Sequence, residues 1–158
     1  MLDQILELIG KGSFGTVYRV FDNLRGGYMV IKAIKTLTHY PDTAKHEYET
    51  LKSIELNDPD NKSLCIRAKE IFHTIINDQE HICITYAEIG KSLNEIMQIY
   101  KILPSFKGLS LKHVQLYGYQ ILKALAFIHD MGYVHADMKP DNIIICSAIC
   151  DVVRLIIF

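Results

Sequence analysis

Residues 135–145 read HADMKPDNIII, and the polar side chains in this stretch carry the groups that one kind of chemistry requires. Transfer of a phosphoryl group needs a side chain that accepts the proton of the attacking hydroxyl, a positive charge beside the migrating phosphoryl, and oxygen ligands for Mg²⁺. We predict Asp137 as the proton acceptor, Lys139 as the cation and Asn142 as the metal ligand. Asp141 is expected to be a turn residue, since Pro140-Asp141 makes a natural turn before the following strand. A plain polar turn without catalytic groups is the alternative for the whole stretch, and the joint spacing of the three side chains argues against it.

Upstream, residues 10–17 read GKGSFGTV, a G-x-G-x-x-G-x-V pattern. The pattern alone is weak, because glycine-rich turns also occur in structural hairpins and in dinucleotide sites. A dinucleotide site needs a helix directly after the glycines and an acidic residue about 20 positions further on. Here a strand-like segment follows, and residues 29–36 hold no acid. The pattern therefore predicts a glycine turn between antiparallel strands, with backbone N–H groups that cover phosphates. If the pattern stood alone, an ordinary structural hairpin would be the favoured interpretation.

Lys32 lies in the apolar segment VIKAIK, residues 30–35. Strand alternation turns its side chain away from its apolar neighbours, and a lysine directed inward needs an anion. Phosphate oxygens and Glu47 of the following helix are both candidates. Glu47 is preferred to Glu49 because it shares the apolar face of that helix. Lys35 is expected to be solvated.

The hydrophobic pattern divides the chain near Gly90 into a strand-rich half and a helix-rich half. One helix is expected to interrupt the strands, with Asp42 or Thr43 as its N-cap, and a Ser92/Glu95 capping box opens the next. The predicted strands are 5–12, 14–22, 28–35, 65–76, 80–89 and 143–146, and the predicted helices are 41–56, 92–100 and 110–132. The fourth and fifth strands are expected to form a hairpin around the turn NDQ, residues 77–79. The last helix is expected to carry its apolar face on Leu111, Val114, Gly118, Ile121, Leu125 and Ile128.

Composition limits the class of protein. The chain has 158 residues, of which 49% are hydrophobic and 22% charged, the balance of one packed domain. A net charge of −1 gives no electrostatic reason to expect nucleic-acid or membrane binding. The four cysteines form no Cys-x-x-Cys pair, and neither a signal peptide nor a transmembrane segment is predicted, so an intracellular, reducing location is expected.

In this order, GKGSFGTV, VIK, Glu47 and HADMKPDN resemble the first two-thirds of a eukaryotic protein kinase domain, over about Leu6 to Cys146. The resemblance implies an α+β, bilobal protein-kinase-like fold. Residues 1–89 would form a complete N-lobe and hinge, with an antiparallel five-stranded sheet and one helix, and residues 90–158 an incomplete helical C-lobe. It also implies ATP and Mg²⁺ as cofactors.

The resemblance assigns site residues. It makes Tyr86 the gatekeeper and residues 87–89 the hinge that meets adenine. The catalytic set is Asp137, Lys139, Lys32 and Glu47, with Asn142 for metal. The nucleotide-binding set is Gly10, Lys11, Gly12, Ser13, Phe14, Gly15, Val17, Lys32, Tyr86, Ala87 and Ile89.

Among kinases, HADMKPDN together with DPDNKSLCIR is most similar to the pre-mRNA-processing splicing kinases of the CMGC group. That similarity implies protein substrates, splicing factors among them, and a location in the nucleus or cytoplasm, with the nucleus favoured.

The sequence also departs from the kinase pattern. Ala136 replaces the usual arginine of H-R-D, so a contact from that arginine to a phosphorylated activation loop cannot form. The segment ICSAICDVVRLIIF takes the place of the expected strand pair and D-F-G, and Asp151 resembles a degenerate D-F-G aspartate. We expect a truncated domain that aggregates readily and has negligible catalysis by itself. A nucleotide-binding, pseudokinase-like module and a fragment that binds another kinase remain the alternatives.

Overall fold

The computed structural model describes residues 4–11, 15–36, 40–87, 90–102, 108–147 and 152–156, without the side chains of residues 4, 40–43 and 147. The chain forms two compact units. The first comprises residues 1–53 and 67–89, and the second comprises residues 54–66 and 90–158. Residues 54–66 thus cluster with the second unit, although they precede the division near Gly90.

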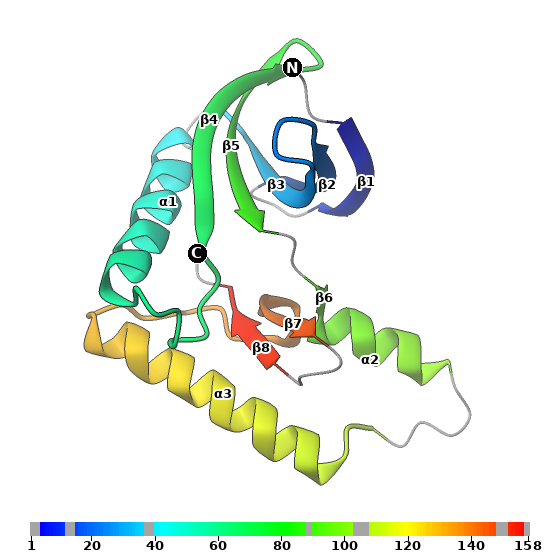
Figure 1. Ribbon diagram of the computed structural model, residues 1–158, viewed down its shortest axis with the longest axis vertical. Coiled ribbons are helices and arrows are strands. Elements are labelled where there is room, and N and C mark those ends of the chain that lie inside the picture. Colours follow the sequence, from blue (N-terminus) through cyan, green and yellow to red (C-terminus); the bar gives the residue numbers. More distant parts are fainter. Residues whose placement is uncertain are drawn as a thin grey trace. The chain divides into compact units, whose positions relative to one another are not determined.

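The first unit is built on an antiparallel five-stranded sheet in the order β1-β2-β3-β5-β4, as predicted (Figure 1). Its strands are β1 (Gln4–Lys11), β2 (Thr16–Asp22), β3 (Gly27–Lys35), β4 (Ala68–Ile76) and β5 (Gln79–Ala87). The turn between β2 and β3 has Gly26 at φ +68°, the conformation expected of a glycine at that point. Lys35, at the end of β3, is exposed as predicted.

The hairpin of β4 and β5 closes through a two-residue turn. Asn77 and Asp78 both have positive φ, 50° and 58°, which is the backbone of a type I′ turn and matches the right-handed twist of the strands. Asn and Asp tolerate this conformation better than other non-glycine residues. The predicted hairpin is therefore confirmed, with β4 beginning at Ala68 instead of Cys65.

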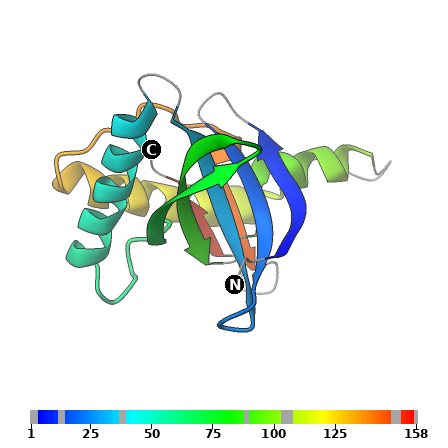
Figure 2. The ribbon, with the colours of Figure 1, turned by 90° about the horizontal axis from the view of Figure 1, so that it is seen from above.

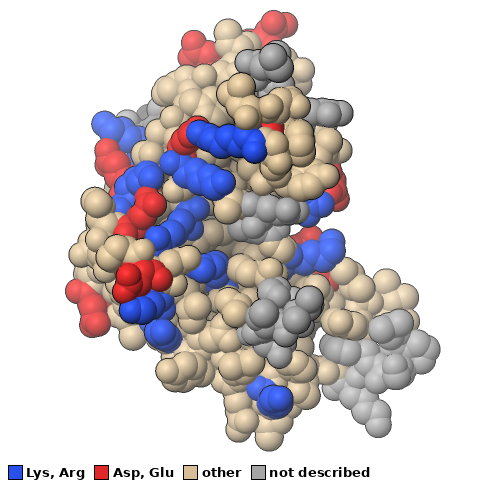
Figure 3. Space-filling view, viewed as in Figure 1, with Lys and Arg blue, Asp and Glu red and all other residues tan. Residues whose placement is uncertain are grey.

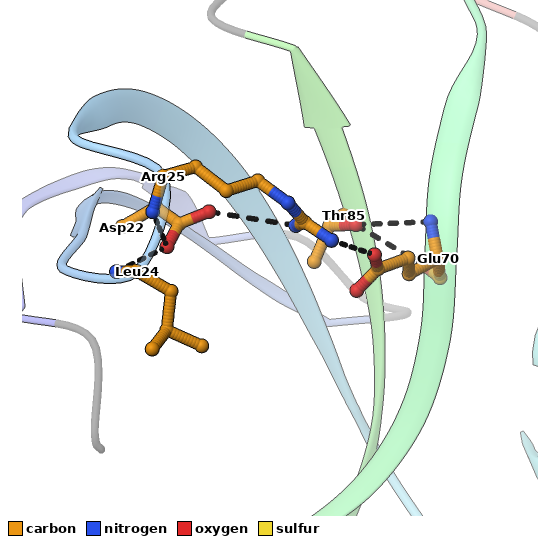
Figure 4. A network of polar contacts seen from close by, with 5 residues as sticks. All are labelled: Asp22, Leu24, Arg25, Glu70 and Thr85. Atoms are coloured by element: carbon orange, nitrogen blue, oxygen red, sulfur yellow. Dashed lines mark hydrogen bonds and ion pairs between the residues drawn. The ribbon is translucent and has the colours of Figure 1, made fainter.

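A polar network links the β2–β3 turn to β4 (Figure 4). The Asp22 carboxylate accepts hydrogen bonds from the backbone N–H groups of Leu24 and Arg25, at 2.9 and 3.0 Å. These bonds, that of Arg25 first, hold the pKa of Asp22 below its ordinary value. The Arg25 guanidinium reaches Glu70 at 2.6 Å. The Thr85 hydroxyl accepts from the Glu70 N–H and donates to its carbonyl, where the β4 register shifts.

Helix α1 (Tyr40–Asn57) places one face of its first three turns against the sheet (Figure 2). The buried side chains of that face include Ala44, Glu47 and Leu51, so Glu47 does share the apolar face. The predicted N-cap at Asp42 or Thr43 is wrong, because the helix already begins at Tyr40. Pro41 explains the early start, since proline fits the first helical turn, where its missing N–H has no partner to lose.

The second unit combines two helices with a small sheet (Figure 1). Its elements are β6 (Lys91–Ser92), α2 (Leu93–Lys101), α3 (Leu111–Asp130), the 3₁₀ turn η1 (Pro140–Asn142), β7 (Ile143–Ser147) and β8 (Val152–Leu155). The Ser92/Glu95 capping box is present, with both of its hydrogen bonds. The buried core consists of Ile54, Cys65, Leu93, Tyr117, Ala124, Ile128, Ile143, Val153 and Leu155.

Helix α3 buries a face different from the predicted one. Ile128 is buried and Ile121 and Leu125 pack against the core, but Leu111 and Val114 are 72% and 51% exposed. The inward face is instead made by Tyr117, Gln120, Ala124 and Ile128. The prediction failed because apolar residues lie all around this helix, so the hydrophobic period alone does not select a face.

The strand predicted at 143–146 is confirmed as β7. β8 pairs with it, which corrects the prediction that the expected strand pair is replaced. β7 and β8 pair antiparallel in the order β6-β7-β8. On its other side β8 contacts the 58–66 loop, where the Leu155 N–H donates to the Leu64 carbonyl and the Ile66 N–H donates to the Leu155 carbonyl, at 2.9 and 2.8 Å. The Val153 N–H donates to the side-chain oxygen of Gln120 on α3 at 2.9 Å.

Charges of both signs are interspersed over the face drawn in Figure 3, in keeping with a net charge of −1. Within the described part of the chain, no helix combines the length and the apolar character needed to cross a membrane. The described cysteines Cys65, Cys83 and Cys146 are free thiols.

Gly90→Ala is expected to lower the free energy of unfolding by about 2 kcal/mol, because a Cβ at this position would collide with the Ile145 carbonyl oxygen of β7. Urea unfolding followed by circular dichroism measures the change. Gly118→Ala in α3 is the control: its Cβ would meet no atom within 4 Å, and alanine should stabilise the helix by about 1 kcal/mol. Equal stability of the Gly90 variant and the original chain would contradict the close approach.

Candidate functional site

The glycine turn lies between β1 and β2, as predicted. Gly10 and Lys11 pair with Val17 and Thr16, while Gly12, Ser13 and Phe14 lie outside the described residues. A Cβ on Gly15 would approach the Ala33 carbonyl oxygen of β3 to 2.6 Å. Only glycine therefore lets the chain enter β2 this close to β3, the strand that carries Lys32.

Lys32 and Glu47 form a buried ion pair in the first unit. The Lys32 ammonium contacts both carboxylate oxygens of Glu47, at 2.9 and 2.7 Å, and the two residues are only 8% and 4% exposed. A buried charge of either sign is strongly unfavourable without its partner. The pair therefore fixes α1 to the sheet at one defined point and directs the lysine inward, as the strand alternation predicted.

Tyr86 completes this cluster, and its contact was not predicted. Its hydroxyl donates to the Glu47 carboxylate at 2.9 Å, and the side chain is 6% exposed. Burial first, and then the Glu47 charge, raises the pKa of Tyr86 well above its ordinary value. The signal in the sequence was a tyrosine inside the predicted buried strand HICITYA, since a buried phenol needs a polar partner. Ala87 follows at the exposed end of β5, and Ile89 lies outside the described residues.

The second group of candidate residues lies in the second unit, around η1. The Asp137 carboxylate contacts the Lys139 ammonium at 2.7 Å and accepts a hydrogen bond from the Asn142 side-chain amide at 3.0 Å. The same amide nitrogen donates to the Asp137 carbonyl at 2.8 Å, and Asn142 is buried. Asp141 is exposed and accepts a hydrogen bond from Asn94 of α2, which agrees with its predicted role as a turn residue.

These contacts shift the pKa values of Asp137 and Lys139. The hydrogen bond from Lys139, followed by that from Asn142, lowers the pKa of Asp137 below its ordinary value, and the hydrogen bond from Asp137 raises the pKa of Lys139. Both groups therefore stay ionised at neutral pH. A carboxylate in this state can accept a hydrogen bond from an incoming hydroxyl group.

His135 and Ala136 shape the loop from within. The backbone N–H of Asp137 donates to Nδ1 of His135 at 3.2 Å, so the proton of a neutral ring lies on Nε2, which donates to the Ile156 carbonyl at 2.6 Å. Ala136 has φ +60°, a left-handed conformation that costs a non-glycine residue about 1–2 kcal/mol. The buried His135 ring and its two hydrogen bonds hold the backbone in that form.

The two cofactors implied by the resemblance fit the described residues differently. A nucleoside triphosphate fits: Lys32 offers a positive charge oriented by Glu47, on the strand next to the one that follows the glycine turn. For Mg²⁺ the predicted ligand is Asn142. No group of three metal-binding side chains occurs among the described residues, and Asp151 lies outside them. In the sequence Asp151 precedes β8, whereas the aspartate of D-F-G is expected after the second strand of the pair.

Lys32→Met is expected to lower the free energy of unfolding by about 3 kcal/mol, because it leaves the buried Glu47 carboxylate with the Tyr86 hydroxyl but no cation. Urea unfolding at neutral pH measures the change, with Lys35→Met on the same strand as the exposed control, expected to fall within about 0.5 kcal/mol. Similar losses for both variants would mean that the ion pair contributes nothing specific.

Lys139→Ala is expected to raise the pKa of Asp137, because the ammonium that favours the charged carboxylate is removed. Carboxyl-carbon NMR of Asp137 through an acid titration measures this directly. Lys101→Ala, in the last turn of α2, removes a charge that has no described contact with Asp137 and should leave its titration unchanged. A pKa that does not move in Lys139→Ala would show that the lysine does not stabilise the carboxylate.

Comparison with known proteins agrees with this geometry. The protein kinase domain family matches residues 4–156. The chain is 30% identical over 151 residues to the dual specificity protein kinase lkh1 of Schizosaccharomyces pombe, covering 96% of this chain and 21% of the relative. It is 33% identical to KNS1 of Saccharomyces cerevisiae, covering 90% and 18%, and 32% identical to CLK2 of Mus musculus, covering 92% and 28%; both are also dual specificity protein kinases. The chain spans roughly a fifth to a quarter of these relatives' lengths. It belongs to the protein kinase family, with relatives among the dual-specificity kinases.

Proposed function

We propose that this chain is the ATP-binding and catalytic-loop region of a protein kinase, which moves the γ-phosphoryl group of ATP to a protein hydroxyl. The observation that carries the proposal is the buried Lys32–Glu47 pair, with both carboxylate oxygens on the ammonium. A structural ion pair has no need of a glycine turn on the neighbouring strands, and a phosphate-binding lysine does.

The proposed roles combine the kinase resemblance with the contacts found within each unit. The backbone of the glycine turn and Lys32 hold the phosphates, with Glu47 keeping the lysine in place. Residues 86–89 would bind adenine through backbone groups, and Tyr86 bounds that region from behind. Asp137 orients the substrate hydroxyl and accepts its proton, and Lys139 supplies positive charge at the transferred group. Proteins carrying serine, threonine or tyrosine hydroxyls are the proposed substrates.

A nucleotide-binding module without transfer is the second candidate. One observation favours it: residues 143–158 read IIICSAICDVVRLIIF and contain no D-F-G triplet. For the 158-residue chain by itself we therefore expect nucleotide binding with negligible transfer.

We further propose splicing factors among the substrates and a nuclear location, on the similarity of HADMKPDN to the splicing kinases. Fluorescence microscopy of the tagged protein, with a nuclear stain, tests the location. A signal excluded from the nucleus would contradict it.

ATP binding is the test of the proposed function. The purified chain is expected to bind a fluorescent ATP analogue that unlabelled ATP displaces. Lys32→Met should weaken binding by about tenfold or more, since one charge-assisted phosphate contact is worth about 1.4 kcal/mol or more.

Lys35→Met is the matched control, because Lys35 lies on the same strand but is exposed, and its affinity should equal that of the original chain. Circular dichroism on each variant separates lost binding from lost folding. Undisplaceable or absent binding by the original, folded chain would contradict the nucleotide-binding role.

A further inference from the structure

We propose that the Tyr86 hydroxyl prepares Lys32 for a bound phosphate, because it holds one oxygen of the Glu47 carboxylate and leaves the ammonium less tightly bound to Glu47. Tyr86 is thus a positioning residue, which acts on the nucleotide through Glu47 and Lys32. The inference rests on the proposed ATP binding and adds a residue to the group that serves the phosphates. All three residues lie in the first unit.

The sheet brings Tyr86 and Lys32 to the same face. Lys32 of β3 pairs with Ile84 of β5, and Val30 of β3 pairs with Tyr86. Side chains two positions apart on a strand share a face, so Tyr86 and Lys32 are diagonal neighbours on two adjacent strands. Glu47 of α1 contacts both side chains, and one carboxylate therefore receives donors from two strands.

The two oxygens of the Glu47 carboxylate have different donors. Oε2 accepts a hydrogen bond from the Lys32 ammonium at 2.7 Å. Oε1 accepts from the same ammonium at 2.9 Å and from the Tyr86 hydroxyl, also at 2.9 Å. When the ammonium turns toward a phosphate, Oε1 therefore keeps the hydroxyl as a donor, and Oε2 keeps the lysine attached to α1.

Burial makes the second donor on Oε1 important. Lys32, Glu47 and Tyr86 are 8%, 4% and 6% exposed, so a hydrogen bond lost here is not replaced by water without a large loss of free energy. Glu47 and the phosphate oxygens compete for one ammonium. Without the hydroxyl, Oε1 would have the ammonium alone among the contacts of the described residues, and Glu47 would hold the lysine more strongly against a phosphate.

A tyrosine suits this role because its hydroxyl remains a neutral donor. Burial first, and then the charge of Glu47, raises the pKa of Tyr86 well above its ordinary value. An anion at this position would attract the Lys32 ammonium itself, and a second cation would bind phosphate in place of the lysine. The phenol supports the carboxylate without adding a charge of either sign.

Displacement of a fluorescent ATP analogue by ATP and by adenosine tests this role. Tyr86→Phe removes the hydroxyl alone and is expected to weaken ATP binding by about fivefold or more, since a hydrogen bond to a charged group is lost. Adenosine has no phosphate, so its affinity should stay within about twofold. Tyr28→Phe is the matched control, because Tyr28 is 53% exposed and phenylalanine keeps its edge contact with the Phe21 ring. This control should bind both competitors as the original chain does.

The outcomes separate the role of Tyr86 from the proposed ATP binding. An unchanged ATP affinity in Tyr86→Phe, or an equal loss for ATP and adenosine, would overturn the inference and leave ATP binding intact. Failure of ATP to displace the analogue from the original, folded chain would overturn both proposals.

A measurement on the original chain covers the case in which Tyr86→Phe does not fold. Carbon-13 NMR follows Cζ of Tyr86, the ring carbon that bears the hydroxyl. ATP should shift this signal further than adenosine does, because the hydroxyl bonds more strongly to Oε1 of Glu47 once Lys32 is shared with phosphate. Both ligands carry the same adenine ring, so equal shifts would overturn the inference.

Discussion

The ion pair between Lys32 and Glu47 is the constraint on which the first unit depends. Two opposite charges are removed from water almost completely, so each is tolerable only while the other stays within hydrogen-bond distance. The Tyr86 hydroxyl on the same carboxylate adds a third element, and β3, α1 and β5 are thereby joined through a single side chain. An apolar contact tolerates a shift of a fraction of an ångström with little loss of free energy, whereas this hydrogen-bonded cluster does not. The cluster therefore fixes the position of the Lys32 side chain.

In the second unit, backbone hydrogen bonds take the place of a buried ion pair. Its loop of candidate catalytic residues is fixed mainly by backbone contacts: His135 holds both the Asp137 N–H and the Ile156 carbonyl, and Asn142 bonds to the Asp137 carbonyl. The charged atoms of Asp137 and Lys139 remain accessible, because His135 and Asn142 hold the backbone of the loop in place. The same His135 ring also fixes the backbone of Ile156, whose N–H donates to the Asn142 carbonyl at 2.9 Å, so the loop around Asp137 and the end of β8 are held by one set of contacts.

Features carried by local pattern could be predicted from the sequence. The five strands, the Asn77-Asp78 turn, the capping box and the pairing of Lys32 with Glu47 each depend on spacing within one or two segments.

The errors in the predicted fold have physical causes. The early start of α1 follows from Pro41, which the prediction read as a boundary although proline is accepted in a first helical turn. The inward face of α3 is chosen by tertiary packing, which buries the polar Gln120 and leaves Leu111 exposed. The β7–β8 pair was overlooked because no D-F-G follows it. The Tyr86 hydroxyl bond joins residues 39 positions apart and no spacing rule could have given it.

Gln120 has a consequence for association between molecules. β8 is the outer strand of the small sheet, and an outer strand with free N–H and C=O groups is a template on which a strand of another molecule can add. Here the Val153 N–H is occupied by Gln120, and the N–H and C=O of Leu155 are occupied by the 58–66 loop. Sheet extension at this edge is therefore blocked from within the chain. Exposed apolar side chains such as Leu111 and Leu122 of α3, 72% and 66% exposed, remain in the same unit, and association through them would be side-chain contact without a shared β-sheet.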